Sequence, residues 1–384
     1  MELEFWLPTR VVFGKGILKQ AAQLIGQALQ GKRVFLVTDQ GVASVGIVSP
    51  LLDQLTEAGY VVEVFDKVQP NPRDVDCDEG GKAIRLFGAD IVLAVGGGSV
   101  LDSSKAISLL STHDGSIRDY EGRNRLVRDV TPIVAVPTTA GTGSEVTRSA
   151  VITDTSRKFK MTVKDPRLAP RLALVDPETT YTLPRQLTAS TGMDALVHAL
   201  EAFTSRKANP FSDAWASQAL QLIFPNLRPA VQHGDRSARD KLMLGSVMAG
   251  VAFSHADVGA VHCMAEALGG IYDTPHGIAN SVFLPVVTEF NLEADPEKHG
   301  QAARLCGLDI QGLTPIDAGK LLVSQLYELS RDIGIPRLRE LGYVNPADFQ
   351  ALAQRSFVNG STPSNCRAIT EQDYLELFEK AYSL

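Results

Sequence analysis

Four short apolar runs in the first half of the chain, separated by amphipathic helical patterns, limit the fold more than any other feature. The runs are Arg33–Thr38, Val61–Phe65, Ile91–Val95 and Ile133–Val136, with segments such as Ser49–Ala58 and Asp78–Phe87 between them. Apolar runs of this length are typical of buried strands, and strands that alternate with helices form a parallel sheet covered on both faces. The first half is therefore predicted to be a Rossmann-like α/β domain.

Helical patterns dominate the rest of the chain, after about Leu183. They cover Thr188–Thr204, Ser212–Val231, Ala238–Ala256 and Pro315–Asp332, and strand patterns almost vanish. A chain of 384 residues also exceeds the size of one ordinary core. We therefore predict an α/β domain over residues 1–183 and an all-α domain over residues 184–384, with a cleft between them. The boundary is placed at Pro184, because proline disfavours helix at the residue before it.

The composition is typical of a folded globular chain without electrostatic affinity for polyanions. Hydrophobic residues make up 44% and charged residues 21%, and the formal net charge is −7. A negative net charge removes the usual reason to bind nucleic acid or an anionic membrane, so neither is an expected partner. The basic stretch that contains Arg118, Arg123, Arg125 and Arg128 is expected to be a solvated loop.

The N-terminus and the cysteines predict a cytoplasmic protein. Residues 1–10 lack the basic start and the apolar run of a signal peptide. No apolar stretch approaches the ~18 residues expected of a membrane span. The four cysteines are far apart and form no C-x-x-C pair, so neither a disulfide framework nor a thiolate zinc site is expected.

A glycine-rich turn joins the apolar run Ile91–Val95 to a helical pattern over Val100–Leu110. Its sequence, Gly96-Gly97-Gly98-Ser99, allows a sharp turn and a close approach to a ligand. The N–H groups at the start of the following helix are suited to phosphate oxygens. The triplet is not the G-x-G-x-x-G fingerprint, and a purely structural tight turn is the alternative.

A second polar turn, Pro137–Glu145, follows the run Ile133–Val136. Small hydroxyl residues at the carboxyl end of a strand suit a ligand, although Thr142 or Ser144 could instead cap a helix. Two such turns on one sheet favour an extended ligand such as a dinucleotide. Asp39, which follows the run Arg33–Thr38, is placed to accept a ribose diol and to repel a 2′-phosphate, which favours NAD over NADP. An ordinary loop acid is the alternative for Asp39.

Three of the seven histidines lie in contexts that suit a metal site. Asp194 and His198 are one turn apart on one face of a predicted helix. His262 lies in another helical pattern, and His276 follows Thr274-Pro275. A carboxylate with three imidazoles suits Fe²⁺ or Zn²⁺ better than Mg²⁺ or Ca²⁺. Spacing alone leaves open that each histidine is structural.

Together these motifs resemble those of the iron-containing (group III) alcohol dehydrogenases, which share a fold with glycerol dehydrogenase and dehydroquinate synthase. The similar segments are Phe13–Gly16, Asp39, Pro70–Pro72, Gly96–Ser99 with Asp102, Pro137–Thr147, Thr191–His198, Gly259–His262 and Thr274–Asn280. They run through most of the chain, and their order and spacing are specific. The resemblance implies the dehydroquinate synthase-like fold.

The resemblance also implies a metal site and a cofactor site. It implies that Asp194, His198, His262 and His276 hold the metal; four ligands resemble the iron branch, so Fe²⁺ is expected, with Zn²⁺ as the alternative. The residues implied along NAD are Asp39, Asn71, Gly97, Gly98, Ser99, Asp102, Thr138, Thr139, Thr147, Ser149, Lys160 and Thr179. Phe253 resembles an aromatic residue of the substrate pocket.

The chain departs from the family pattern beside the metal motif. Many members carry a second histidine one turn after the equivalent of His262, and Glu266 stands there in this sequence. His255 stands where many relatives have asparagine. Both are therefore candidates for a rerouted proton relay. A later family Asn-Pro-Arg is Asn365-Cys366-Arg367 here.

The expected activity is hydride transfer between NAD and a small alcohol, with the aldehyde or ketone as the oxidised product. The alternatives are a dehydroquinate-synthase-like lyase, a zinc glycerol-dehydrogenase-like enzyme, and a non-enzymatic module that responds to NAD or metal. The identity of the alcohol stays open. A homodimer or larger homo-oligomer is expected, in which the N-terminal segment Leu7–Phe13 adds to a neighbouring sheet.

Overall fold

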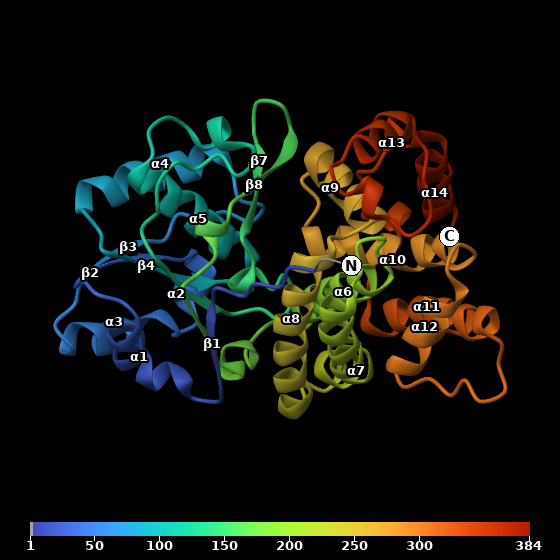
Figure 1. Cartoon of the computed structure of the whole chain (residues 1–384), viewed down its shortest axis with the longest axis horizontal. Coiled ribbons are helices and arrows are strands. Elements are labelled where there is room, and N and C mark those ends of the chain that lie inside the picture. Colours follow the sequence, from blue (N-terminus) through green and yellow to red (C-terminus); the bar gives the residue numbers. More distant parts are fainter. Residues whose placement is uncertain (1–2) are drawn as a thin grey trace. The chain divides into compact units, whose positions relative to one another are not determined.

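The computed structural model describes residues 3–384, which form two compact units (Figure 1). One unit contains Trp6–Thr139 and Gly143–Leu183. The other contains Pro184–Leu384, together with Ala140–Thr142 and the N-terminal segment that ends at Phe5. The first unit is an α/β structure and the second is helical, which agrees with the predicted fold class.

The α/β unit is built on a six-stranded sheet in which every pairing is parallel. Its strands are β1 (Arg10–Phe13), β2 (Arg33–Val37), β3 (Val61–Phe65), β4 (Ile91–Gly96), β6 (Ile133–Pro137) and β9 (Leu172–Val175). The four predicted strands are confirmed, with ends that differ by one residue at most. The edge strand β1 lies inside the predicted segment Leu7–Phe13 but begins only at Arg10.

The strand order in the sheet is β1-β9-β6-β4-β2-β3. The order in which the chain adds strands changes sides between β2 and β4, although both strands point the same way. From β2 the chain runs outward to β3 and then returns to β4 on the other side of β2. Loops that leave the carboxyl ends of two such neighbouring strands diverge, which opens the usual ligand position of an open parallel sheet. Asp39 follows β2 and Gly97 follows β4, so both lie at this position.

Helices cover both faces of this sheet (Figure 1). They are α1 (Ala21–Ala28), α2 (Gln40–Ser44), α3 (Val48–Glu57), α4 (Asp74–Phe87) and α5 (Gly98–Thr112), with short 3-10 helices η1 (Ile17–Gln20), η2 (Ile117–Tyr120), η3 (Ser144–Val146), η4 (Pro166–Leu168) and η5 (Pro177–Thr180). Successive strand residues point to opposite faces. Val34 and Leu36 therefore pack with α1 and α3, while Phe35 and Val37 pack with α4 and α5.

A second, smaller sheet was not predicted from the sequence. It contains β5 (Gly122–Arg123), β7 (Ser149–Asp154) and β8 (Phe159–Lys164); β7 and β8 form an antiparallel hairpin. β7 alternates partly exposed and buried side chains, and β8 does so except at Lys160 and Met161, unlike the continuously buried strands β4, β6 and β9 of the large sheet. Strands with one solvated face give a weaker apolar signal, which explains the omission.

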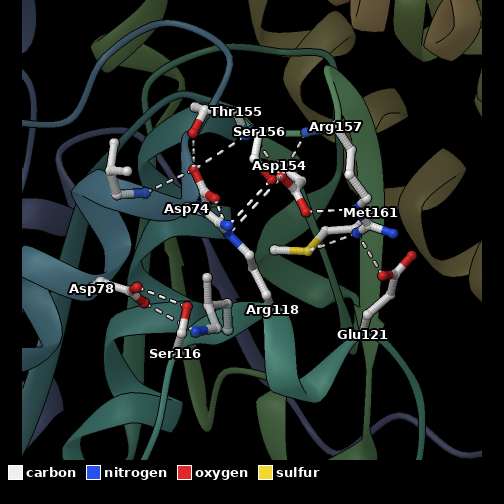
Figure 2. Close-up of polar contacts among 12 residues, drawn as sticks. Asp74, Asp78, Ser116, Arg118, Glu121, Asp154, Thr155, Ser156, Arg157 and Met161 are labelled. Atoms are coloured by element: carbon white, nitrogen blue, oxygen red, sulfur yellow. Dashed lines mark hydrogen bonds and ion pairs between the residues drawn. The ribbon is translucent and has the colours of Figure 1, made fainter.

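Polar contacts at the start of α4 hold the turn of this hairpin (Figure 2). The buried carboxylate of Asp74 accepts hydrogen bonds from the Arg118 guanidinium and from Thr155 Oγ1, the latter at 2.9 Å. Burial would raise the pKa of Asp154, but hydrogen bonds from Ser156 and Arg157 outweigh it and hold that pKa well below its ordinary value. Arg118 is exposed, as expected, but it lies in the short helix η2 instead of a loop, and its guanidinium bonds a buried carboxylate.

The helical unit contains nine α-helices within the described residues. They are α6 (Arg185–Thr204), α7 (Pro210–Gln232), α8 (Arg236–Ala256), α9 (Ala260–Tyr272), α10 (His276–Leu292), α11 (Pro296–Leu305), α12 (Pro315–Ile333), α13 (Phe349–Phe357) and α14 (Glu371–Ser383), with η6 (Leu338–Leu341), η7 (Pro346–Asp348) and η8 (Thr362–Ser364). The four predicted helices are confirmed; three of them begin two or three residues earlier than predicted, and α12 begins at the predicted residue. Most of α6 is buried, so its polar residues are enclosed by protein.

The turn between α8 and α9 determines the direction of α9. Asp257 adopts a positive φ of 69° immediately after α8. Its carboxylate accepts hydrogen bonds from Ser361 Oγ, Ser364 Oγ and Lys207 Nζ, which stabilise this uncommon conformation.

In residues 3–384 no single helix is long and apolar enough to cross a membrane. The helices α8 and α9 meet that test only as a pair, and the pair is bent by 100°.

Candidate functional site

Asp194, His198, His262 and His276 lie together in the helical unit. One donor atom from each lies within 4.8 Å of the corresponding atom of every other member. We call these four residues the metal quartet. His198 Nε2 is 2.9 Å from His262 Nε2, and His276 Nε2 is 3.7 Å from Asp194 Oδ1. The first three members are buried, and His276 is partly exposed. The helix that carries Asp194 and His198 and the two consecutive helices that carry His262 and His276 therefore converge on one point.

Close helix packing brings the quartet together. Asp194 and His198 are one turn apart on α6, His262 is in the first turn of α9, and His276 is the first residue of α10. A Cβ atom at Gly277 would lie 2.6 Å from the carbonyl oxygen of Ser190, closer than real Cβ contacts. Glycine at this position therefore lets the start of α10 approach α6 and places His276 beside Asp194.

Glu201 contacts His262 and was not among the residues predicted from the sequence. Glu201 Oε2 is 2.6 Å from His262 Nδ1, and Glu201 Oε1 accepts the backbone N–H of Val261 at 2.7 Å. A carboxylate beside Nδ1 keeps the proton on that nitrogen and leaves the Nε2 lone pair directed into the quartet. Glu201 follows His198 by three residues on α6, and this helical spacing was the available signal.

Asn280 is a second polar residue of the site that was not assigned a role. Its Nδ2 atom lies 2.6 Å from Asp194 Oδ1, 3.0 Å from His276 Nε2 and 3.2 Å from His262 Nε2. Its buried Oδ1 atom has no hydrogen-bond partner among the described residues. Asn280 is one turn after His276 on α10, within the motif Thr274–Asn280. An amide side chain is a weaker ligand for Fe²⁺ or Zn²⁺ than imidazole or carboxylate, so the residue type alone did not mark this position.

The electrostatics of the quartet favour a bound cation. Burial lowers the pKa of His198 to about 4, so this imidazole is neutral at neutral pH and offers a lone pair. Burial would raise the pKa of Asp194, but the neighbouring His198, His276 and His262 outweigh it and lower that pKa. Burial would also lower the pKa of His262, but the hydrogen bond and charge of Glu201 raise it. One carboxylate and three imidazoles that converge in a buried space fit Fe²⁺ or Zn²⁺.

Two of the three predicted catalytic residues lie beside this group. The ring of Phe253 stacks on His198, with centroids 4.4 Å apart. Glu266 is one turn after His262 on α9, and its Oε2 accepts a hydrogen bond from Asn359 Nδ2 at 2.6 Å. His255 instead stacks on Phe5 at 4.6 Å, and its Nδ1 lies 2.8 Å from Val251 O. These described contacts of His255 involve no member of the quartet.

The two turns predicted to bind a cofactor are adjacent in the α/β unit. Gly96 on β4 pairs with Pro137 on β6, and Thr138 N donates to Gly96 O at 3.0 Å. A Cβ atom at Gly97 would lie 3.2 Å from Thr139 Cγ2, so the two turns nearly touch. Gly98 and Ser99 begin α5, where backbone N–H groups have no helical partner. Thr142 and Ser144 do not cap η3, whose N-cap is Gly143.

The other predicted cofactor residues lie around these turns with contacts of their own. Asp39 caps α2, and its Oδ1 accepts from Val42 N at 2.9 Å. Lys160 Nζ donates to Asn71 Oδ1 at 2.8 Å, and both residues are buried. Thr179 Oγ1 lies 3.0 Å from Pro137 O. Asp102, Thr147 and Ser149 belong to a network around Lys105, a residue that the sequence analysis did not single out.

Comparisons with known proteins cover nearly the whole chain. The model of the iron-containing alcohol dehydrogenase family matches residues 8–177, and that of its C-terminal part matches residues 188–382. The 1,3-propanediol dehydrogenase of Klebsiella pneumoniae is 43% identical over 383 residues, which cover 99% of this chain and 98% of that protein. The NAD-dependent methanol dehydrogenase of Bacillus methanolicus is 40% identical over 98% of this chain and 99% of its own length.

Solved structures show the same relationship. A crystal structure of 1,3-propanediol oxidoreductase superposes with a TM-score of 0.95 at 42% identity, and covers 99% of this chain and 100% of its own. The alcohol dehydrogenase from Oenococcus oeni has a TM-score of 0.95 at 36% identity, with the same coverage. These full-length matches confirm the resemblance found in the motifs. The chain belongs to the iron-containing alcohol dehydrogenase family and is an oxidoreductase of that family.

Proposed function

We propose that this protein is an NAD-dependent, iron-requiring dehydrogenase that interconverts a small alcohol and its aldehyde or ketone. The observation that carries the proposal is the convergence of Asp194, His198, His262 and His276 within 4.8 Å. Relatives whose names specify 1,3-propanediol, methanol or lactaldehyde support a small alcohol as the substrate class. The family assignment does not favour the lyase or the non-enzymatic alternative.

The residues of the quartet would hold the metal through Asp194 Oδ and the histidine Nε2 atoms. A bound Fe²⁺ supplies a Lewis acid that polarises the oxygen of the alcohol or carbonyl. Glu201 keeps the proton on His262 Nδ1, so that Nε2 is available as a donor. Phe253 packs on the His198 ring and gives the site an apolar wall, which suits a small carbon chain. The donor set accepts both Fe²⁺ and Zn²⁺. We propose Fe²⁺ because the family is iron-containing.

The α/β unit is proposed to bind NAD. Asp39 and Gly97 lie at the reversal of strand order, where an open parallel sheet usually takes its ligand. The carboxylate of Asp39 suits a ribose diol, and the N–H groups at the start of α5 suit the pyrophosphate. The proposed domains are residues 1–183 for NAD and residues 184–384 for the metal. In the reaction the nicotinamide accepts or donates the hydride.

Assembly and location remain part of the proposal. The edge strand β1 offers unpaired backbone groups to a second copy, which supports a homodimer or larger homo-oligomer. The four cysteines are free thiols, three of them buried, which supports the reducing cytoplasm as the location.

An anaerobic activity assay tests the proposed function. The metal-free protein is reconstituted with Fe²⁺ or with Zn²⁺ and mixed with NAD and a panel of short alcohols and diols, while NADH absorbance is followed. We expect turnover with at least one alcohol. The rate should be higher after reconstitution with Fe²⁺ than with Zn²⁺. Asp194→Ala and His262→Ala should abolish turnover and metal retention while the circular dichroism spectrum is preserved. Full activity after exhaustive chelation would exclude the proposal.

A further inference from the structure

Lys105 is a completely buried lysine in the middle of α5. Its Nζ atom donates to Ser144 Oγ at 2.6 Å, to Thr147 Oγ1 at 2.9 Å and to the carbonyl oxygen of Ser149 at 2.7 Å. A lysine has three N–H donors, so these three acceptors use them fully. Burial lowers the pKa of Lys105, so the neighbouring acceptors must stabilise its charge. Enclosing a lysine in a core is unfavourable without such a set of partners.

Asp102 completes the network from the preceding turn of α5. Its Oδ1 accepts from Ser144 Oγ at 2.6 Å and lies 3.4 Å from Lys105 Nζ, and its Oδ2 accepts the backbone N–H of Val151 at 2.9 Å. Both carboxylate oxygens are therefore used within the protein. The hydroxyl of Ser144 accepts from Lys105 and donates to Asp102, so it joins the two charges.

This network connects the segments that leave the ends of β4 and β6. Asp102 and Lys105 belong to the helix that begins at the glycine-rich turn, while Ser144 lies in the second polar turn and Thr147 follows that turn. Val151 and Ser149 are on β7, the partner of the strand that carries Lys160. Two side chains of one helix therefore contact both the second polar turn and β7.

We propose that Asp102 and Lys105 are positioning residues, a buried charge pair that holds the two turns and β7 in the arrangement that binds NAD. This inference rests on the proposed function, because it takes NAD as the ligand of those turns. It also replaces the direct cofactor contact expected for Asp102 with a role through Ser144 and Val151. Hydrogen bonds to charged groups in a low-dielectric interior are strong and directional, which suits a fixed spacing.

Single and double substitutions separate positioning from simple stability. Lys105→Met leaves Asp102 without its cation, and Asp102→Asn leaves Lys105 without its anion, so each single variant should lower the melting temperature. The double variant removes both charges of the pair and, measured at pH 6, where the neighbouring Glu145 is mostly protonated, should regain much of that loss. Its dissociation constant for NADH, from fluorescence titration, should nevertheless stay at least tenfold above that of the unaltered protein. A tenfold change corresponds to about 1.4 kcal/mol.

Ser144→Ala tests the same inference with a smaller change, should the charge variants not fold. It removes the hydroxyl that joins the two charges and should weaken NADH binding while metal content stays the same. Lys320→Met is the matched control, because Lys320 and Asp317 form an exposed pair with the same i,i+3 spacing and the same 3.4 Å distance. That variant should bind NADH normally.

The outcomes are distinguishable. Normal NADH affinity in Ser144→Ala, or a double variant that regains stability and affinity together, would overturn the positioning role while the proposed function stands. Absence of saturable NADH binding by the unaltered protein would refute the proposed function and this inference with it. An increase in the NADH dissociation constant that is larger than in Lys320→Met and persists in the stable double variant would support the inference.

Discussion

Glu201 Oε2 lies 2.6 Å from Nδ1 of His262, although the two residues are 61 positions apart in the sequence. The second oxygen of the same carboxylate accepts the backbone N–H of Val261 at 2.7 Å. One buried acid therefore fixes both the backbone at the start of α9 and the ring of a proposed metal ligand. A carboxylate in this position makes the imidazole a more basic ligand.

Glu201→Gln is expected to weaken metal binding about 10- to 100-fold, in the range usual for such supporting residues. The amide has a single acceptor oxygen, so it cannot accept from both Val261 N and His262 Nδ1. Competition with a chromogenic chelator measures the metal affinity directly, and Glu289→Gln, at an exposed ion pair with Lys380, is the control. Unchanged metal affinity in Glu201→Gln would show that Glu201 does not orient His262.

Substitutions of Asp39 should change the choice of cofactor. The unaltered protein is expected to have a higher kcat/KM with NAD than with NADP, because the carboxylate repels a 2′-phosphate. Asp39→Gly should relax that preference. Asp39→Asn keeps an acceptor for Val42 N at the start of α2, so it isolates the effect of the charge. Equal kcat/KM values for both cofactors in the unaltered protein would contradict this assignment.

Glu266 is expected to take part in proton transfer. Glu266→Gln should lower kcat, leave the metal content unchanged and remove one limb of the pH–rate profile. Asn359→Ala removes the 2.6 Å hydrogen bond to Glu266 and should alter the same limb without deleting the acid. If Glu266→Gln changes mainly KM and alcohol preference, the residue shapes the pocket instead. A normal kcat with an unaltered profile would exclude the relay and leave His255 or a water chain as the next candidate.

Glu145 should make the stability of the protein depend on pH. Burial raises the pKa of this carboxyl to about 7, well above its value in an unfolded chain. A raised pKa means that the folded state holds the proton more tightly, so the stabilisation is complete below about pH 4 and is lost as the pH rises through about 7. Glu145→Gln stays neutral and should be more stable than the unaltered protein at pH 8, by about 2–3 kcal/mol.

Denaturant unfolding at pH 5 and pH 8 measures this difference. The difference in the free energy of unfolding between Glu145→Gln and the unaltered protein should be smaller at pH 5, because Glu145 is protonated there in the folded state. Glu121→Gln, at a partly exposed ion pair with Arg157, is a control that should show no comparable change between the two pH values. The same gap at both pH values would mean that Glu145 does not ionise in this range.

Local patterns in the sequence were sufficient for most of the architecture. Continuous apolar runs such as Ile91–Val95 and helical periodicity such as that of α12 depend on neighbours within a few residues, so they were detectable without a structure. Asp194 and His198 are only four residues apart, so helical periodicity was also enough to place them on one face of a helix. The strands β7 and β8 mix buried and partly exposed residues, so they contain no continuous apolar run. The hairpin that carries Lys160 was therefore not predicted.

The completed sites depend on contacts between residues far apart in the chain. Spacing could not show that His262 and His276 join Asp194, because their meeting requires the close approach of α10 to α6 at Gly277. It also could not show that Glu201 supports His262 or that Lys105 joins α5 to Ser144. Periodicity identifies which face of a helix is buried. The packing of the whole unit decides which group pairs with a buried polar side chain. Burying a charge without a partner is unfavourable in free energy, so such groups are paired in the folded state.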